Sequence, residues 1–328
     1  MGNFIYSQLV KSYGLPYPNT HNFKGKTIVI TGGNSGLGKE AARHYARLGA
    51  SRLILAVRDL DKGHSAKHDI EATTRCAEGT IQVWKLDLGS YTSVQKFASR
   101  VRDELDRVDI FHANAGVARK DYSIVEGNEE MITVNVVSTF LLVALIVPVL
   151  KATAARFHIR PTLSISTSGT HGHTTFPQSA APEGGIFDAV NDKVTAEKHW
   201  DEQYPVSKLL GVFAVRSIAE RNPSSEFPVT INLVDPGLCH SDLGRDYPTW
   251  GFFFIKLVLA RSTEVGSRTL VHAGSAGRES HGQYLEDCQL SQPAPLVTSP
   301  KGKADQDRVW KELVVKLERI QPGVTANL

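Results

Sequence analysis

The chain has 328 residues, of which 41% are hydrophobic and 22% are charged. These fractions lie close to the averages of globular proteins and exclude a disordered or fibrous chain. Its 37 basic and 34 acidic residues leave a net charge of only +3, which argues against nucleic acid or an anionic membrane as a partner. Three cysteines are too few for a disulfide framework, so we expect a soluble, cytoplasmic protein.

Short apolar runs alternate with helical patterns along most of the chain. A polar arm without a clear period, residues 1–25, precedes this alternation. The predicted strands are 27–31, 53–57, 81–86, 109–113, 162–167 and 229–234. The predicted helices are 36–48, 60–74, 91–105, 129–150 and 204–220. The alternation predicts parallel β-α-β units, so we expect an α/β fold with a single doubly wound, Rossmann-type parallel sheet and helices on both faces.

Two long irregular stretches interrupt the alternation. The first covers residues 168–203 and the second residues 238–262. Long loops inside a compact α/β domain are usually functional. The second stretch contains Trp250 and three consecutive phenylalanines, 252–254, which we interpret as a substrate lid. An apolar lid favours a hydrophobic small molecule as the substrate.

The end of the chain has an amphipathic pattern behind a Pro-rich connector at 292–302, which predicts a C-terminal helix docked on the body. The apolar residues at helical spacing are Val309, Trp310, Leu313, Val314, Leu317 and Ile320. We therefore expect an arm (1–25), one main domain (26–290) and a C-terminal extension (291–328). The most apolar run, 140–150, is too short to span a bilayer, so we expect a buried helix and no membrane span.

A glycine-rich loop, residues 31–38, follows the first predicted strand directly, and a helix opens from it. Glycines let a backbone approach a pyrophosphate without side-chain collision, and the helix N-terminus offers free N–H groups and a partial positive charge. This placement favours a dinucleotide site over an ordinary strand–helix turn. The predicted cofactor-binding residues here are Gly32, Asn34, Ser35, Gly36, Leu37 and Gly38.

The residue that follows the second predicted strand is Arg58. An acidic residue near this position holds the ribose hydroxyls of NAD, whereas an arginine can pair with the 2′-phosphate of NADP. The sequence therefore favours NADPH/NADP+ over NADH. A solvated surface arginine is the alternative, and the adjacent Asp59 keeps NADH open.

Tyr204 and Lys208 lie four residues apart, so both side chains project from one face of a helix. A phenol has a pKa near 10, and a neighbouring ammonium favours the phenolate. Such a pair can exchange protons at neutral pH, although the same spacing also occurs on ordinary amphipathic helices.

In combination, the loop at 31–38, the tripeptide 114–116 and the segment 204–208 resemble the short-chain dehydrogenase/reductase family over residues 25–290. The chain is similar to retinol-dehydrogenase-like members and to fungal secondary-metabolite reductases, on the segment 235–241 among others. The resemblance implies an NADP-dependent enzyme that transfers a hydride between nicotinamide and a carbonyl or secondary alcohol. It makes the main domain a dinucleotide-binding catalytic domain.

The resemblance also implies catalytic roles. Tyr204 would exchange a proton with the substrate oxygen, and Lys208 would lower the pKa of Tyr204 and hold the nicotinamide ribose. Ser168 would hydrogen-bond the carbonyl oxygen, with Ser166 as its rival. Asn135 would support a proton relay through its backbone.

Further cofactor contacts are implied after later strands: at the adenine, around the adenosine ribose, and beside the nicotinamide. These residues are Asp87 and Leu88; Asn114, Ala115 and Gly116; and Pro236, Gly237, Leu238 and Ser241. The chain departs from the family pattern at Ala113, where a second asparagine is usual. It also separates Ser168 from Tyr204 by 36 residues, more than simpler members do.

Other interpretations remain beside this one. We interpret His171 and His173 as loop polarity or a substrate contact and expect no metal site, because no cysteine or carboxylate stands at ligand spacing. A catalytically inactive, cofactor-binding regulatory protein is an alternative function, as is an imine or enone reductase on the same fold. The sequence is compatible with a monomer or a homodimer.

Overall fold

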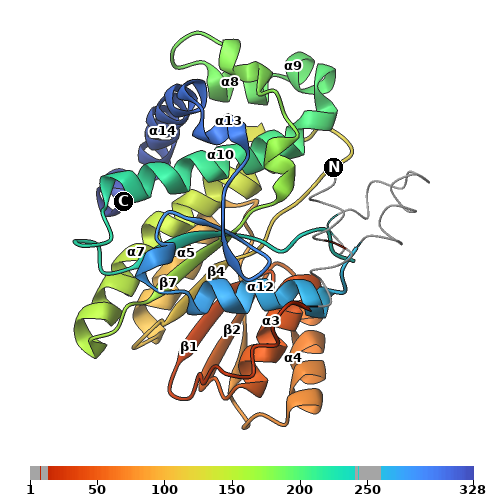
Figure 1. Cartoon of the computed structure of the whole chain (residues 1–328), viewed down its shortest axis with the longest axis vertical. Helices are drawn as coiled ribbons and strands as arrows, with labels where there is room; N and C mark the ends of the chain where they lie inside the picture. The colour runs from red at the N-terminus through yellow and green to blue at the C-terminus, as the bar shows by residue number, and fades with distance from the viewer. Residues whose placement is uncertain (1–7, 9–13, 241–242, 244–259) are drawn as a thin grey trace.

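The computed structural model describes Gln8, residues 14–240, Leu243 and residues 260–328. Its centre is an eight-stranded sheet in the order β10-β9-β8-β7-β4-β1-β2-β3 (Figure 1). Every neighbouring pair is parallel except β9 and β10. The strands are β1 (Thr27–Thr31), β2 (Arg52–Val57), β3 (Ile81–Lys85), β4 (Ile110–Ala113), β7 (Thr162–Ser166), β8 (Thr230–Asp235), β9 (Tyr284–Glu286) and β10 (Gln289–Ser291). A separate hairpin pairs β5 (Ile124–Val125) with β6 (Asn128–Glu129).

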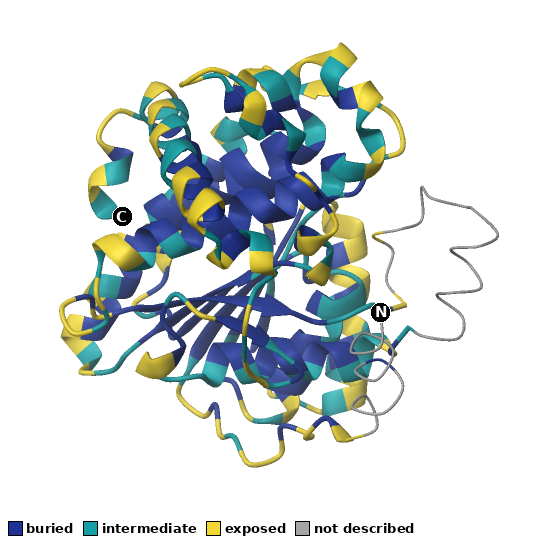
Figure 2. Ribbon diagram, turned by 45° about the horizontal axis from the view of Figure 1, so that its top comes forward, coloured by how far each residue is buried: buried dark blue, intermediate teal, exposed yellow. Residues whose placement is uncertain are grey.

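Helices cover both faces of the sheet, which confirms the predicted doubly wound fold. One face packs against α3 (Gly36–Arg47), α4 (Leu60–Thr74) and α12 (Thr263–Ser275). The other packs against α5 (Tyr91–Glu104), α7 (Ser138–Phe157) and α10 (Trp200–Arg221). The C-terminal helix α14 (Pro300–Ile320) lies outside α10, as predicted. Figure 2 shows the buried residues gathered in the sheet and on the helix faces that meet it.

The inner strands are buried along most of their length, since a parallel sheet is covered on both sides. All five residues of β1 and all six of β8 are buried. The sequence order reverses between β1 and β4, which lie side by side. In open α/β sheets, ligands bind at such a reversal, outside the carboxyl ends of the strands.

The helical stretch predicted for 129–150 ends later than expected. It consists of α6 (Glu130–Ile132), a π-helical turn η2 (Thr133–Val137) and α7, which passes through Pro148. Proline has no N–H and so cannot bond the carbonyl of Ala144, four residues earlier. Asn327 Nδ2 donates to that carbonyl instead, at 3.2 Å. The contact with Asn327 therefore satisfies a carbonyl that Pro148 leaves without its helical donor. Local sequence does not reveal this contact.

The same stretch, Glu130–Phe157, is long and apolar enough to cross a membrane, so the shorter run recognised in the sequence understated its length. However, 83% of its most apolar window is buried inside the protein. Its apolarity is explained by contacts with the sheet and with α5, as in the core helix of a soluble protein.

The first irregular stretch, 168–203, contains short helices that the sequence analysis did not predict. Glu312 on α14 accepts hydrogen bonds from the N–H groups of Ile186 and Phe187, at 3.1 and 2.8 Å, at the start of one of them. Arg308 on α14 donates to carbonyls of residues 179–182. The elements are η3 (Gly169–Gly172), η4 (Pro177–Ala180), α8 (Ile186–Asn191) and α9 (Lys193–Lys198). The segments around η4 and the start of α8 thus bond to partners more than a hundred residues away, which local patterns cannot show.

Other boundaries also differ from prediction. Helix α10 begins at Trp200 rather than Tyr204, and the connector at 292–302 already contains α13 (Pro295–Thr298) and the start of α14. Helix α12 and strands β9 and β10 were not predicted. Trp250 and residues 252–254, which we interpreted as a substrate lid, lie outside the described part of the chain, as does Ser241.

The β9–β10 hairpin is closed by a strained turn. Asp287 and Cys288 both have left-handed backbones, with φ of 52° and 57°, in a two-residue turn that normally favours Asn-Gly. Arg261 Nη2 lies 2.5 Å from Asp287 Oδ1, and the two side chains are 0% and 2% exposed. Arg261 also donates to the carbonyl of Pro236, at 3.3 Å. This buried ion pair therefore ties the hairpin to the loop after β8.

Replacing Asp287 by Ala should leave the Arg261 guanidinium buried without this carboxylate. We expect D287A to lower the free energy of unfolding by about 3–5 kcal/mol in urea denaturation. The matched control is D307A, which removes an ion pair with Lys303 whose side chains are 48% and 42% exposed. That variant should lose less than about 1 kcal/mol. Equal losses in the two variants would contradict the structural role given to Asp287.

Candidate functional site

A cavity of about 1550 Å³ opens along the carboxyl ends of the parallel strands. Its walls come from the segments that directly follow β1, β2, β3, β4, β7 and β8, and from α10. Pockets for a single drug-sized ligand run to roughly 300–1,000 Å³. The cavity therefore has room for a dinucleotide and a second molecule side by side.

The loop after β1 fits a phosphate group. Gly32 and Gly36 have left-handed backbones, with φ of 70° and 55°, which glycine adopts without strain. A Cβ on Gly38 would lie 2.5 Å from the carbonyl oxygen of Gly32, so no side chain fits there. Ser35 is the N-cap of α3 and makes no side-chain hydrogen bond to the first turn. The first turn also contains no acidic residue, so its N–H groups and partial positive charge suit an anion.

Asn114 joins three strands at the floor of the cavity. Thr31 Oγ1 accepts from the backbone N–H groups of Asn114 and Ala115, both at 2.9 Å. The Asn114 side chain donates to the Thr31 carbonyl at 2.9 Å and accepts from Ser166 Oγ at 3.4 Å. The segment Asn114–Gly116 therefore lines the cavity because β1, β4 and β7 hold it in place.

The far end of the cavity carries the residues predicted for the adenosine half. Arg58 is exposed at this rim, beside Lys62. The carboxylate of Asp59 caps α4, accepting from the N–H of Lys62 at 3.1 Å. Asp87 Oδ1 accepts from the N–H of Gly89 at 2.9 Å, and the neighbouring Leu88 is buried. The Asp59 carboxylate, which could otherwise hold ribose hydroxyls, is thus engaged at the start of α4. Arg58 presents its charge at the cavity.

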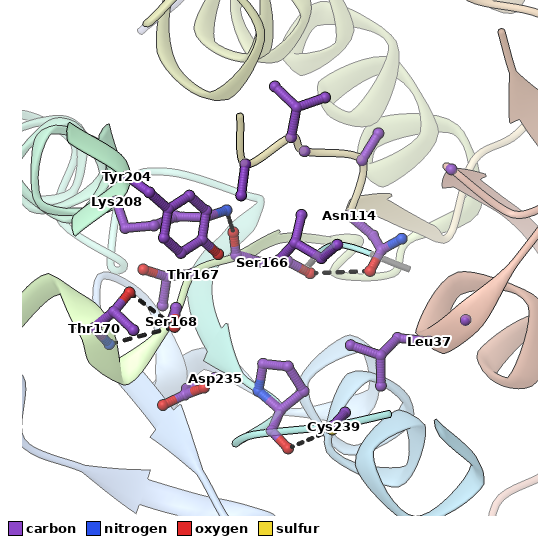
Figure 3. A pocket seen from close by; sticks show the side chains of 18 of the residues that line it. Leu37, Asn114, Ser166, Thr167, Ser168, Thr170, Tyr204, Lys208, Asp235 and Cys239 are labelled. Atoms are coloured by element: carbon purple, nitrogen blue, oxygen red, sulfur yellow. Dashed lines mark hydrogen bonds between the residues drawn. The ribbon is translucent and has the colours of Figure 1, made fainter. Parts of the chain in front are cut away.

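Tyr204 and Lys208 lie side by side on α10 and face the cavity, as Figure 3 shows. Lys208 Nζ is 5.7 Å from the centre of the Tyr204 ring and donates to the carbonyl of Ser166 at 3.1 Å. Burial lowers the pKa of Lys208 to about 8, against the opposing pull of the Asp235 carboxylate. The ammonium is therefore held at the end of β7, next to a phenol that reaches the cavity.

The two rival serines have different surroundings. Ser166 Oγ donates to the Asn114 amide, within the strand junction. Ser168 lies beyond the end of β7 and caps the turn η3. Its Oγ accepts from Thr170 N at 3.3 Å and from Thr170 Oγ1 at 3.0 Å. Two accepted bonds leave the Ser168 hydroxyl proton to be donated, so the geometry favours Ser168 as a donor to a bound oxygen.

Asn135 lies in the π-helical turn η2, behind the cavity wall rather than in its lining. Its Oδ1 accepts from Val117 N at 2.8 Å, and its Nδ2 donates to Val117 O at 2.9 Å and Ser207 Oγ at 3.0 Å. A Cβ on Gly116 would lie 3.0 Å from Asn135 Oδ1 and 3.4 Å from Lys208 Nζ. Asn135 therefore positions the loop after β4 against α10, and its part in a proton relay stays a prediction.

The structure adds wall residues that the sequence analysis did not select. Asp235, at the end of β8, is 3% exposed and accepts from Tyr284 Oη at 2.8 Å and Gly237 N at 2.9 Å. Its position directly before Pro236-Gly237 was the signal that could have found it. Tyr284 and the segment 291–294 also line the cavity, but they belong to the unpredicted β9–β10 hairpin and to the connector after it. Pro236, Gly237 and Leu238 line the cavity as expected from their place after β8.

His171 and Cys239, near the site, are engaged by backbone groups. His171 Nδ1 lies 2.8 Å from the carbonyl of Ser168, and Cys239 Sγ donates to the carbonyl of Pro236 at 3.4 Å. Within the described ranges, no group of three or more His, Cys, Asp or Glu residues is placed to hold a metal ion.

Replacing Gly38 by Ala should disrupt the phosphate loop, because the added Cβ would lie 2.5 Å from Gly32 O and 2.7 Å from Asn114 Nδ2. We expect G38A to weaken dinucleotide binding by at least about tenfold in a fluorescence titration, which is about 1.4 kcal/mol. The matched control is G211A on α10, where the added Cβ meets only Phe140 Cε2 at 3.9 Å. Unchanged binding by G38A would contradict the role of this loop.

Comparisons with known proteins agree with this geometry. The family model for short chain dehydrogenases matches residues 26–167. A short chain dehydrogenase/reductase of Cryptosporiopsis sp. is 68% identical over 324 residues, covering 99% of each chain. The RhlG/NADP active-site complex of Pseudomonas aeruginosa has a TM-score of 0.61 at 20% identity and covers 83% of this chain and 97% of its own. A 3-ketoacyl-(acyl-carrier-protein) reductase of Brucella melitensis complexed with NADH has a TM-score of 0.59 at 17% identity and covers 81% of this chain and 97% of its own. The chain therefore belongs to the short-chain dehydrogenase/reductase family, as the resemblance in its motifs implied.

Proposed function

We propose that this protein is an NADP(H)-dependent oxidoreductase that interconverts a carbonyl and a secondary alcohol on a hydrophobic small molecule. The observation that carries the proposal is the pairing of Tyr204 with the buried ammonium of Lys208 at the cavity. The phosphate loop lies in the same cavity, so a dinucleotide held there reaches the pair. When bound, the nicotinamide supplies or accepts the hydride.

The chain's own residues handle the substrate oxygen and its proton. In the reducing direction, Tyr204 Oη donates a proton to the oxygen as negative charge develops on it. A pKa of about 8 keeps most of the Lys208 side chain charged at neutral pH, and that charge stabilises the phenolate left behind. The Ser168 hydroxyl donates a hydrogen bond to the same oxygen and fixes its position. Oxidation of the alcohol uses the same groups in reverse.

The choice of NADPH rests on the rim of the cavity. Arg58 and Lys62 place two cationic side chains there, which suits a doubly charged 2′-phosphate. The nearby carboxylate of Asp59 is engaged at the start of α4 and lies 3.8 Å from Lys62 Nζ. Solved structures of this fold occur with NADP and with NADH, so these rim residues carry the argument for the cofactor.

A hydrophobic substrate is supported by apolar side chains that line the cavity. They include Ala118, Leu238, Leu243 and Ala294. We place the substrate in secondary metabolism because the chain resembles fungal secondary-metabolite reductases. The apolar wall makes a neutral ring system a better fit than a strongly charged metabolite.

Removing the phenol oxygen should abolish proton transfer without affecting the dinucleotide site. We expect Y204F to lower kcat by about 10²-fold or more, measured as NADPH oxidation across a panel of aromatic ketones and quinones. Its dissociation constant for NADPH should stay close to that of the wild type. The matched control is Y122F, which removes a hydrogen bond to the carbonyl of Asn191, outside the cavity lining, and should keep wild-type kcat. Wild-type turnover by Y204F would remove Tyr204 from the mechanism.

The cofactor preference can be tested separately from the chemistry. We expect R58A to raise the dissociation constant of NADPH by about tenfold or more, because a hydrogen bond to a charged group is worth roughly 1.5–3 kcal/mol. The constant for NADH, which has no 2′-phosphate, should change little in the same variant. Equal losses for the two cofactors would contradict the role of Arg58 in selecting NADPH.

A further inference from the structure

His171 connects two parts of the cavity wall that are far apart in the sequence. It lies in the turn η3, and only 3% of its surface is exposed. Nδ1 of its ring is 2.8 Å from the carbonyl oxygen of Ser168. Its Nε2 is 2.9 Å from the backbone nitrogen of Ala294, which lies 123 residues further along the chain. The ring thus bridges the turn that follows β7 and the segment that leads into the C-terminal helices.

The partners of this ring determine which nitrogen carries the proton. The Ala294 N–H can only donate, so Nε2 must accept with its lone pair. A neutral imidazole then carries its proton on Nδ1, which donates to the Ser168 carbonyl. If Nε2 carried a proton, its N–H would face the N–H of Ala294 with no acceptor between them. Burial also lowers the pKa of His171, which favours the neutral ring. His171 is therefore a neutral donor–acceptor link with a single tautomer.

Close packing keeps this link in one geometry. The ring centre of Tyr284, on β9, is 5.3 Å from that of His171. A Cβ on Gly172 would lie 2.8 Å from the Cβ of Ala294, so the Ala294 side chain packs closely over Gly172. The charged and titratable groups near the ring are Asp235 on β8, Tyr284 on β9 and His173 on the same turn. The two segments are therefore joined directly, by a hydrogen bond and by close packing.

Both linked segments line the same cavity. The turn η3 contributes Ser168, whose hydroxyl is held by Thr170, and the later segment contributes Ser291, Gln292 and Ala294. The Ser168 carbonyl belongs to the peptide that begins the turn, so its hydrogen bond to His171 restricts the backbone from which the hydroxyl projects. Through the His171 ring, the Ser168 peptide is therefore linked to the backbone of Ala294.

We propose that His171 is a positioning residue, which couples the cavity wall at 291–294 to the Ser168 peptide and so holds the Ser168 hydroxyl toward the substrate oxygen. The inference rests on the proposed function for the role of Ser168. It extends that function by assigning part of the catalytic geometry to the C-terminal extension, through a cavity-lining side chain whose two ring nitrogens are engaged by backbone groups.

The tautomer is tested first, because that measurement needs no substrate. The full chain is labelled with nitrogen-15 histidine, and the resonances of His171 are identified by their loss in H171Q. We expect a proton on Nδ1 and none on Nε2 at neutral pH. A protonated Nε2, or rapid exchange between the two tautomers, overturns the link whether or not the enzyme turns over any ketone.

Two substitutions each keep one of the two hydrogen bonds of His171 and remove the other. In H171N the amide retains a donor near the Nδ1 position, and in H171Q the carbonyl retains an acceptor near the Nε2 position. We expect each to lower kcat by about tenfold, the equivalent of about 1.4 kcal/mol, while the dissociation constant of NADPH stays unchanged. The assay uses the ketone or quinone of the panel that the wild-type enzyme reduces fastest. Wild-type kcat in H171N overturns the coupling to residues 291–294.

A double-mutant cycle separates positioning from general damage to the fold. If His171 acts through Ser168, the same substitutions should cause no further loss of kcat in an S168A background. Equal losses in both backgrounds overturn the proposal. Absence of all turnover by the wild-type chain is a failure of the proposed function instead, and the tautomer measurement still decides the link.

Discussion

The site depends on a buried ammonium. Lys208 Nζ is removed from water at the end of β7, where its charge is unfavourable unless polar groups compensate for the lost hydration. The Ser166 carbonyl, which accepts from Nζ at 3.1 Å, and the Asp235 charge provide part of that compensation. The remaining penalty appears as a pKa of about 8, low for a lysine yet high enough to keep the group mostly charged at neutral pH. Because Lys208 is buried, water screens its charge only weakly, and the charge acts on the adjacent Tyr204.

The sheet places the other groups around that ammonium. The carboxyl ends of parallel strands lie at the same edge of the sheet. The residues after β1, β4, β7 and β8 therefore meet at that edge. Asn114 bonds to β1 and β7 simultaneously, which fixes the segment after β4 relative to both strands. Asn135 and Gly116 then set the distance between the β4 loop and α10.

The C-terminal part of the chain provides a second layer of support. Trp310 on α14 lies beneath the Arg221 guanidinium of α10, at 5.3 Å from ring centre to cation. Glu312 and Arg308 hold the long stretch before α10, and Asn327 supplies the donor that Pro148 lacks. The C-terminal extension is thus added structure that supports both α10 and the stretch that precedes it. His171 is the place where this added structure meets the strand-end serine.

Motifs built from near neighbours were visible in the sequence alone. The phosphate loop, the Tyr204–Lys208 spacing and the alternation of strands and helices each depend on residues within about two turns or one strand–helix unit. Together they were sufficient for the fold class and the family. The amphipathic pattern around Trp310 likewise predicted a docked helix, and its apolar side is buried.

Tertiary structure decided the features whose partners are distant. The resemblance favoured Ser168 over its rival Ser166, but only the structure shows that Ser166 contacts Asn114 and Ser168 contacts Thr170. The continuation of α7 through Pro148 requires a donor 183 residues from Ala144, and the single tautomer of His171 requires an N–H 123 residues away. A hydrogen bond satisfies a buried polar group wherever its partner stands in the chain. Local patterns therefore reveal which groups need partners, while folding alone determines which partners they find.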